Sequence, residues 1–305
     1  MTGTTVSKLL DRPTRASDAR PRCGRLFVAV LAMALVIAAP ALAASGGPPI
    51  RSSGCDVSPP QVPPTAISVN GRDRALFLVA GDSDSRTPRD LVIAFHGRTN
   101  SNMQARAYYD LERYAQRPTI FVYPLGLPTE AGSRSWNDAG DSAGQLRDYE
   151  LFDALLLRLA RLYCIDLGRV FAVGHSLGAS FVNNLACARG EKLRGIATVA
   201  GDIAAADCNA AVAAILFHST HDELVSIHRG EAARDRLLTT NGLRGPPSPL
   251  PSADLNCVRY GPANTGAPVV WCAHARTTTS RGNYYPHQWP REAGMLIMAF
   301  FASLP

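Results

Sequence analysis

Beyond its first 39 residues the sequence has no apolar run long enough to cross a bilayer. It has no Cys-x-x-Cys pair or His/Cys spacing typical of a metal site, and no basic cluster interleaved with aromatic residues. The basic excess lies mostly at the start, because residues 1–43 hold six of the 31 Lys and Arg residues and two of the 25 Asp and Glu residues. We therefore expect no metal, no nucleic-acid partner and no transmembrane domain.

Residues 1–43 have the pattern of a secretory signal. Six basic residues precede the apolar stretch 26–39, which is short for a membrane span, and Ala41-Leu42-Ala43 fits an A-x-A cleavage site. An uncleaved anchor is the alternative, because the basic region is long. We expect cleavage after Ala43 and a secreted protein, extracellular or periplasmic, without a stable membrane anchor. Residues 44–64, rich in Gly, Ser and Pro, are expected to form an extended arm, and residues 65–305 one domain.

Six cysteines remain after cleavage, and an even number in an oxidising compartment predicts three disulfides. Cys257 and Cys272 flank a loop between two short alternating runs, and Cys187 ends a predicted helix whereas Cys208 follows the next strand. The remaining pair would tie the arm to the body. Fifteen pairings are possible for six cysteines, so the pairing is a hypothesis. The hypothesis pairs Cys55 with Cys164, Cys187 with Cys208 and Cys257 with Cys272.

Strand and helix patterns alternate along most of the chain. A predicted hairpin over residues 65–79 precedes the alternation. The later strands are expected at 91–96, 119–123, 170–173, 196–200 and 213–217, and the helices at 147–162, from 179, at 229–239 and at 291–302. An antiparallel start followed by strand–helix alternation predicts an α/β fold with a mostly parallel central sheet and helices on both faces.

The segment Gly174-His175-Ser176-Leu177-Gly178 lies between a predicted strand and a predicted helix. Strand, G-x-S-x-G and helix in this order are typical of the nucleophile elbow of α/β-hydrolases. The turn must be sharp, so the positions around the serine need little side chain. Such a turn lifts the hydroxyl clear of the sheet. The pattern predicts Ser176 as the nucleophile, with an ordinary Gly-rich turn as the alternative.

A serine nucleophile needs a base and an orienting acid, which follow it in this fold in the order acid, then histidine. Asp222 comes after the strand 213–217 and is the predicted acid, with Glu223 and, more distantly, Asp202 as alternatives. A turn or helix-capping role is the structural alternative for this aspartate. His287 lies in a Pro-flanked loop before the last helix, where the fold places its base. The other six histidines precede the serine, lie too close to the acid or belong to other elements.

The oxyanion of the reaction needs two backbone donors. One is expected from the N–H of Leu177, the residue after the nucleophile. The other is expected from the loop after an earlier strand, where His96-Gly97 precedes Arg98 and Thr99. We expect the N–H of Arg98 to be the second donor, with Thr99 as the alternative.

Further short motifs stand at defined places: Tyr123-Pro124, Cys164-Ile165-Asp166 before Arg169-Val170, His218-Ser219-Thr220-His221-Asp222 and His287-Gln288-Trp289-Pro290. Together with the His-Gly pair and the elbow, this ordered set over about residues 85–302 resembles secreted esterases of the feruloyl esterase and polyhydroxybutyrate depolymerase superfamily. The resemblance implies an α/β-hydrolase fold, a Ser176–Asp222–His287 triad, ester substrates and no cofactor. The group often has Gly where Ser219 stands, and a Cys-containing loop where Arg98-Thr99-Asn100 stand. These departures leave the substrate open.

The leading prediction is a secreted carboxylic ester hydrolase with a disulfide-stapled catalytic domain, acting through an acyl-enzyme on hydroxycinnamate esters of plant polysaccharide. A polyhydroxyalkanoate depolymerase for short or amorphous polyester is the alternative substrate class. An acyltransferase and a non-catalytic binding protein on the same fold are alternatives from other classes. The sequence does not determine the oligomeric state. Candidate substrate contacts, each alternatively structural, are Trp136, Tyr285 and Trp289, together with the ring-stacking candidates Tyr108, Tyr109 and Tyr284.

Overall fold

A mixed β-sheet forms the centre of the part of the chain that the computed structural model describes. That part comprises residues 47–81, 86–129, 132–136, 147–262, 264–278, 282–283 and 285–305. The predicted signal, residues 1–43, lies outside it. The strands are β1 Ala66–Val69, β2 Arg72–Val79, β3 Arg89–Phe95, β4 Thr119–Pro124, β5 Leu127–Pro128, β6 Arg134–Ser135, β7 Ile165–His175, β8 Gly195–Val199, β9 Ala213–Ser219, β10 Ser248–Pro249, β11 Cys257–Tyr260 and β12 Val269–His274.

Helices alternate with the central strands in the chain. The α-helices are α1 Asn102–Tyr109, α2 Arg147–Leu162, α3 Leu177–Arg189, α4 Ile227–Thr240 and α5 Ala293–Ser303, and the short 3₁₀ helices are Glu112–Tyr114, Gly190–Lys192 and Ala253–Leu255. The ten-stranded sheet has the order β1-β2-β4-β3-β7-β8-β9-β12-β11-β10, while β5 and β6 form a separate hairpin. The strands from β4 to β12 in this order run parallel, and the strands at both edges are antiparallel. This confirms the predicted antiparallel start and mostly parallel centre.

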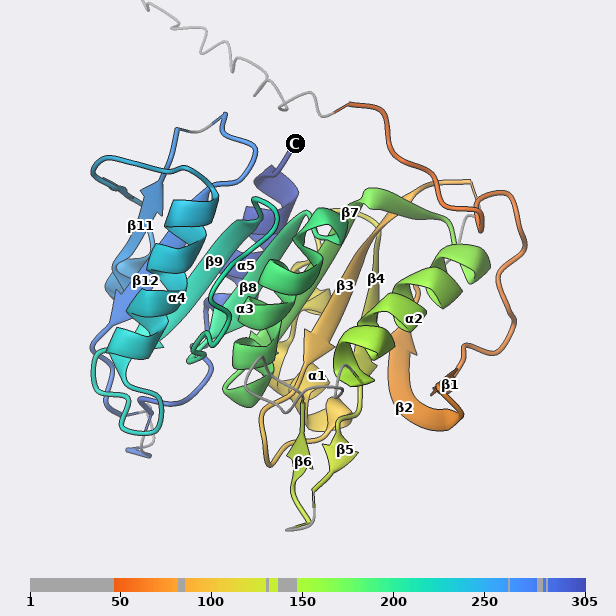
Figure 1. The fold of residues 1–305 in the computed structure, drawn as a ribbon, viewed down its shortest axis with the longest axis horizontal. Coiled ribbons are helices and arrows are strands. Elements are labelled where there is room, and N and C mark those ends of the chain that lie inside the picture. The colour runs from red at the N-terminus through yellow and green to blue at the C-terminus, as the bar shows by residue number, and fades with distance from the viewer. Residues whose placement is uncertain are drawn as a thin grey trace, which may run out of the picture. The chain divides into compact units, whose positions relative to one another are not determined.

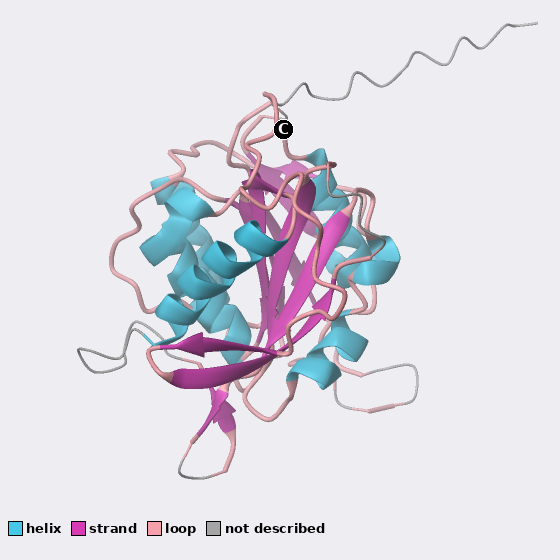
Figure 2. Cartoon of the chain, turned by 90° about the vertical axis from the view of Figure 1, so that its right-hand side faces the viewer, coloured by secondary structure: helices cyan, strands magenta, loops and turns pink. Residues whose placement is uncertain are grey.

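Two hydrophobic cores cover the two faces of this sheet. Alternate residues of β3 point to opposite faces, so Ile93 belongs to the core under α2, α3 and α4 and Val92 to the core under α1 and α5. All seven residues of β3 are buried, because helices cover both sides of the sheet (Figures 1 and 2). The predicted arrangement of helices on both faces is confirmed. No helix in the described ranges is long and apolar enough to span a membrane.

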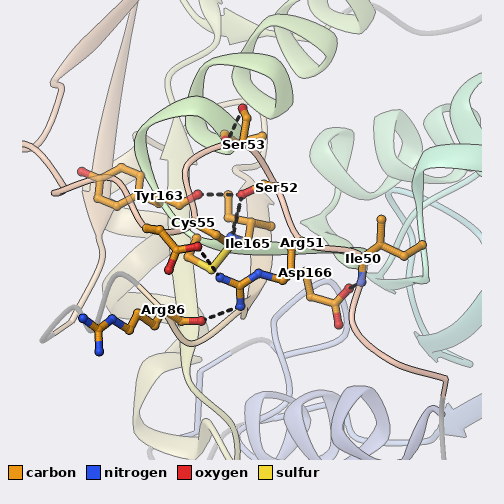
Figure 3. Close-up of a disulfide and its surroundings, with 12 residues drawn as sticks. Ile50, Arg51, Ser52, Ser53, Cys55, Arg86, Tyr163, Ile165 and Asp166 are labelled. Atoms are coloured by element: carbon orange, nitrogen blue, oxygen red, sulfur yellow. Dashed lines mark hydrogen bonds and ion pairs between the residues drawn. A yellow bond between two sulfur atoms is a disulfide. The ribbon is translucent and has the colours of Figure 1, made fainter.

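The described end of the N-terminal arm is bound to the start of β7 (Figure 3). The N–H of Ile50 donates to Asp166 Oδ1 at 2.9 Å. Ser52 Oγ donates to the Tyr163 carbonyl at 2.8 Å and accepts the Ile165 N–H at 2.9 Å. Ser52 is itself buried, so these hydrogen bonds are shielded from water. The arm is therefore attached to the beginning of the strand whose far end carries the nucleophile elbow.

Three disulfides join segments of the described chain. The structure pairs the six cysteines as Cys55–Cys164, Cys187–Cys208 and Cys257–Cys272, the pairing expected from their positions in the sequence. The first links the arm to the residue before β7, and the third crosses between the paired strands β11 and β12. The disulfides thus reinforce the arm and one antiparallel edge of the sheet.

The Cys55–Cys164 disulfide should contribute less to stability than loop closure alone suggests. Its sequence separation is 109 residues, and chain-entropy arguments give roughly 4.7 kcal/mol for a loop of about 100 residues. We expect the Cys55→Ala/Cys164→Ala variant to lose less than that, because an unfolded chain that retains some compact structure gains less entropy from opening the loop than an ideal chain does. Equilibrium unfolding in urea measures the loss. Adding Ser52→Ala should remove a further ~1–3 kcal/mol, and a loss of the full loop value in the first variant would contradict the expectation.

Candidate active site

The turn between β7 and α3 holds Ser176 in a rarely adopted backbone conformation. Its φ of 55° and ψ of −124° lie outside the comfortable regions for a residue with a side chain. Its N–H donates to the Val199 carbonyl at 2.9 Å, at the end of the neighbouring strand. A Cβ on Gly174 would lie 2.3 Å from the Gly178 carbonyl oxygen, and one on Gly178 would lie 2.2 Å from the Phe95 oxygen. The packing thus requires glycine on both sides of the serine.

The side chains of Ser176, His287 and Asp222 form a continuous hydrogen-bonded chain. His287 Nε2 lies 2.7 Å from Ser176 Oγ, and His287 Nδ1 lies 2.8 Å from Asp222 Oδ2. The other carboxylate oxygen, Oδ1, accepts the N–H groups of Leu224 at 2.9 Å and Val225 at 3.0 Å. The structure therefore brings together the three residues predicted as nucleophile, base and acid, from three separate loops.

Asp222 is held in its ionised form. Burial of its side chain opposes ionisation, but the hydrogen bonds from His287 and from the Val225 and Leu224 N–H groups outweigh burial and lower its pKa below the ordinary value. A carboxylate at this position can stabilise the charged imidazole that forms when the histidine takes a proton.

Neither alternative acid contacts His287 within the described residues. Glu223 is exposed beside Asp222. The Asp202 carboxylate pairs instead with Arg229, at 2.8 Å between Asp202 Oδ2 and Arg229 Nη1. The geometry therefore favours Asp222 over both.

A second histidine, His175, supports the loop that carries His287. Its Nε2 lies 2.7 Å from the His287 carbonyl oxygen. Because a carbonyl only accepts, Nε2 must carry the hydrogen and the ring is in its Nε2–H tautomer. Burial lowers the pKa of His175 to about 4, so the ring is neutral at neutral pH. His175 therefore acts as a fixed donor that positions the backbone of His287, a role that its place in the elbow motif alone did not reveal.

A third histidine, His96, orients the loop predicted to bind the oxyanion. The N–H of Gly126 donates to His96 Nε2 at 3.0 Å, so Nδ1 carries the ring hydrogen and donates to the Gly97 carbonyl at 2.7 Å. The C=O and N–H of a trans peptide unit point in opposite directions. Binding of the Gly97 oxygen to the ring therefore turns the Arg98 N–H away from it. Among the described residues this N–H has no hydrogen-bond partner.

A cleft of about 840 Å³ opens above Ser176. Its lining includes the loop 97–100 and Tyr108 of α1. The elbow residues 175–177 also line it, as do Asp202, Leu224 and Arg229. The Leu177 N–H belongs to the first turn of α3, where helix N–H groups have no partner within the helix. Backbone donors from Arg98 and Leu177 thus border the same opening as the serine.

The three aromatic residues predicted to contact substrate lie in the protein interior instead. Trp136, Tyr285 and Trp289 are only 2%, 7% and 5% exposed, and none lines the described cleft. The indole of Trp136 donates to the His96 carbonyl at 2.8 Å, and the ring of Trp289 stacks on Tyr109 at 4.1 Å between centroids. The expectation is corrected: these rings support the loops around the site.

Among the described candidates for substrate contact, Tyr108 lines the cleft. It is 37% exposed, its hydroxyl donates to Gln288 Oε1 at 2.8 Å and accepts the Trp289 N–H at 2.6 Å. It thus links α1 to the loop of His287. The remaining ring-stacking candidate, Tyr284, lies outside the described residues.

Within the described residues no group of three or more His, Cys, Asp or Glu side chains is arranged to hold a metal ion.

Comparison with known proteins gives a consistent class. No family model matches the chain. Feruloyl esterase D from Neurospora crassa is 28% identical over 275 residues, which cover 83% of this chain and 88% of that protein. The carboxylesterase of Bacillus cereus superposes with a TM-score of 0.53 at 14% identity over 75% of this chain and 93% of its own. A thermostable esterase gives a TM-score of 0.53 at 16% identity over 76% of this chain, which spans 57% of that structure.

The solved structures define the fold as that of the α/β-hydrolases. The predicted resemblance to feruloyl esterases is confirmed by the Neurospora crassa protein. The chain therefore has an α/β-hydrolase fold and is similar over most of its length to a feruloyl esterase.

Burial of His175 makes the folded protein sensitive to acid. The unfolded chain binds a proton at this residue near pH 6.5, whereas the folded protein does so only near pH 4, so stability is lost as pH falls between these values. We expect His175→Gln, whose amide can still donate to the His287 carbonyl, to reduce the stability lost between pH 7 and pH 5 by on the order of 2 kcal/mol. Urea unfolding at the two pH values measures it.

The matched control for this experiment is His228→Gln, because the His228 side chain is 86% exposed. This control should lose as much stability between pH 7 and pH 5 as the wild type. An unchanged loss in His175→Gln would contradict the role given to burial.

Proposed function

We propose that the protein is an exported serine esterase that hydrolyses hydroxycinnamate esters of plant polysaccharide through an acyl-enzyme. The observation that carries the proposal is the hydrogen-bonded chain Asp222–His287–Ser176, with contacts of 2.8 and 2.7 Å. These are the distances at which a base can take the proton of a serine hydroxyl and an acid can orient the base.

In this reaction His287 Nε2 takes the proton from Ser176 Oγ as the oxygen attacks the ester carbonyl carbon. The negative charge that develops on the carbonyl oxygen is bound by backbone N–H groups. The C–O bond to the alcohol then breaks, and His287 gives its proton to the leaving oxygen. A water molecule, deprotonated by His287, attacks the acyl carbon. The bond between that carbon and Ser176 Oγ then breaks, His287 returns the proton to Oγ, and the acid is released. Asp222 stabilises the imidazolium in both halves.

We propose the N–H groups of Leu177 and Arg98 as the two oxyanion donors. The His96 side chain supports Arg98 over Thr99, because its hydrogen bond to the Gly97 carbonyl turns the next N–H away from the ring. Arg98 and Ser176 both line the same cleft.

The substrate class and the location rest on separate observations. The relative from Neurospora crassa is named a feruloyl esterase, and a cleft of about 840 Å³ lies within the usual size range of small-molecule binding sites. Three disulfides favour an oxidising compartment, which supports export.

Substitution of the triad tests the proposal. Ser176→Ala should remove nearly all hydrolysis of methyl ferulate, because no other group supplies the attacking oxygen, while the melting temperature stays close to that of the wild type. His287→Ala should be nearly as damaging, and the double variant little worse, because the residues act as a unit. Steady-state kinetics with melting curves measure this. Substantial turnover by pure Ser176→Ala would refute the mechanism.

The acid has its own matched pair of variants. Asp222→Asn should lower kcat severely, whereas Glu223→Gln, one residue further along and exposed, should leave it near the wild-type value. The opposite pattern would show that the acid is wrongly identified.

The hydrogen bond of His96 gives a test of the oxyanion loop. His96→Leu removes the donor to the Gly97 carbonyl and should lower kcat roughly tenfold to hundredfold with little change in KM, because loss of an oxyanion donor acts on the transition state. His96→Asn places an amide donor near the position of Nδ1 and should recover part of the lost kcat. Equal losses in both variants, in step with their melting temperatures, would instead indicate a purely structural role.

A further inference from the structure

One wall of the cleft carries an ion pair that the triad does not use. Asp202 follows β8, Arg229 belongs to the first turn of α4, and both line the opening above Ser176. Asp202 Oδ2 accepts from Arg229 Nη1 at 2.8 Å, and the two side chains are 29% and 63% exposed. Exposed pairs of this kind contribute little to stability, so the position of this one on the cleft wall invites a functional explanation.

The pair is held at a fixed place close to the nucleophile. Ser180 Oγ, one helical turn after Ser176, accepts the Asp202 N–H at 3.2 Å. Asn183 Nδ2 donates to the Asp202 carbonyl at 2.8 Å, and Asn183 is fully buried. The carboxylate is therefore presented from a rigid backbone that is anchored on the helix that begins at the elbow.

The pair also retains unused bonding capacity. Among the described residues no hydrogen bond engages Asp202 Oδ1, or the Nε and Nη2 groups of Arg229. A carboxylate oxygen accepts and a guanidinium donates, so together they offer one acceptor and several donors side by side. Because the two charges neutralise each other, a charged group gains little here, whereas a neutral group that both donates and accepts is well matched.

We propose that the Asp202–Arg229 pair is a subsite for adjacent hydroxyl groups of a sugar, the alcohol portion of the ester. This inference rests on the proposed function, since it concerns the substrate of the same cleft. One hydroxyl donates to Asp202 Oδ1 while the neighbouring hydroxyl accepts from Arg229, a two-point contact that a simple alkyl alcohol lacks. Leu224, an apolar side chain that is 72% exposed and also lines the cleft, offers a surface for the C–H groups of the sugar ring.

Two ferulate esters that differ only in the alcohol test the subsite. Methyl ferulate lacks the diol, and feruloyl arabinofuranose carries it. We expect Asp202→Asn and Arg229→Gln each to lower kcat/KM for the sugar ester roughly tenfold, as for loss of a hydrogen bond to a charged group, and to change that for methyl ferulate less than about twofold. His228→Ala, next to Arg229 and 86% exposed, is the control and should leave both values unchanged.

A parallel loss on both esters would overturn the subsite in favour of a structural role, and no loss on either would overturn it as well. Wild-type turnover of methyl ferulate tests the proposed function independently, because that ester does not reach the pair. If the wild type hydrolyses neither ester, the proposed function fails while the subsite remains testable. Chemical shifts of Ser176→Ala on titration with methyl arabinofuranoside should then respond, and respond less in Ser176→Ala/Asp202→Asn. Equal or absent responses would refute the subsite.

Discussion

The site depends on one steric constraint, the close approach of the elbow to the end of β3. Gly178 packs so closely that a Cβ there would lie 2.2 Å from the Phe95 oxygen, and the turn holds Ser176 at a φ of 55°. This packing brings the start of α3 against the loop that follows β3. The serine, the first free N–H groups of α3 and the Arg98 loop consequently share one opening. A larger side chain at Gly178 would separate the nucleophile from the oxyanion loop before it affected any hydrogen bond of the triad.

Around this turn three histidines hold backbone and side chains in one arrangement. His96 uses one ring nitrogen to accept the Gly126 N–H and the other to donate to a carbonyl, and His175 donates to the carbonyl of His287. Burial keeps the first two rings uncharged, since it lowers the pKa of each. His287, the histidine proposed to transfer protons, is thus surrounded by two neutral histidines that only position the backbone. Burial and the hydrogen-bond partners of each ring nitrogen determine which role each histidine takes.

The alternation of strands and helices and the elbow were predictable, because long apolar strands and a five-residue motif carry strong local signals. The two-residue strands β5, β6 and β10 were not, since two residues cannot show alternation. Asp222 and His287 could be proposed from chain order alone, and the structure places both beside Ser176. Trp136 and Trp289 were misjudged as substrate contacts, because residue type does not distinguish a core ring from a cleft ring. The Asp202–Arg229 pair joins residues that only the folding of β8 against β9 brings together.

The attachment of the arm to β7 has a mechanical consequence. Tension applied through the N-terminal end of the described chain reaches the Cys55–Cys164 disulfide before it reaches β1, the strand at the edge of the sheet. The load therefore passes into the middle of the sheet, where β7 is flanked by β3 and β8, and acts along the strand in shear instead of peeling the edge strand away. A tether or fusion partner at this end of the folded domain would therefore pull on the strand that ends just before Ser176, and the hydrogen bonds of β7 to β3 and β8 would share that load.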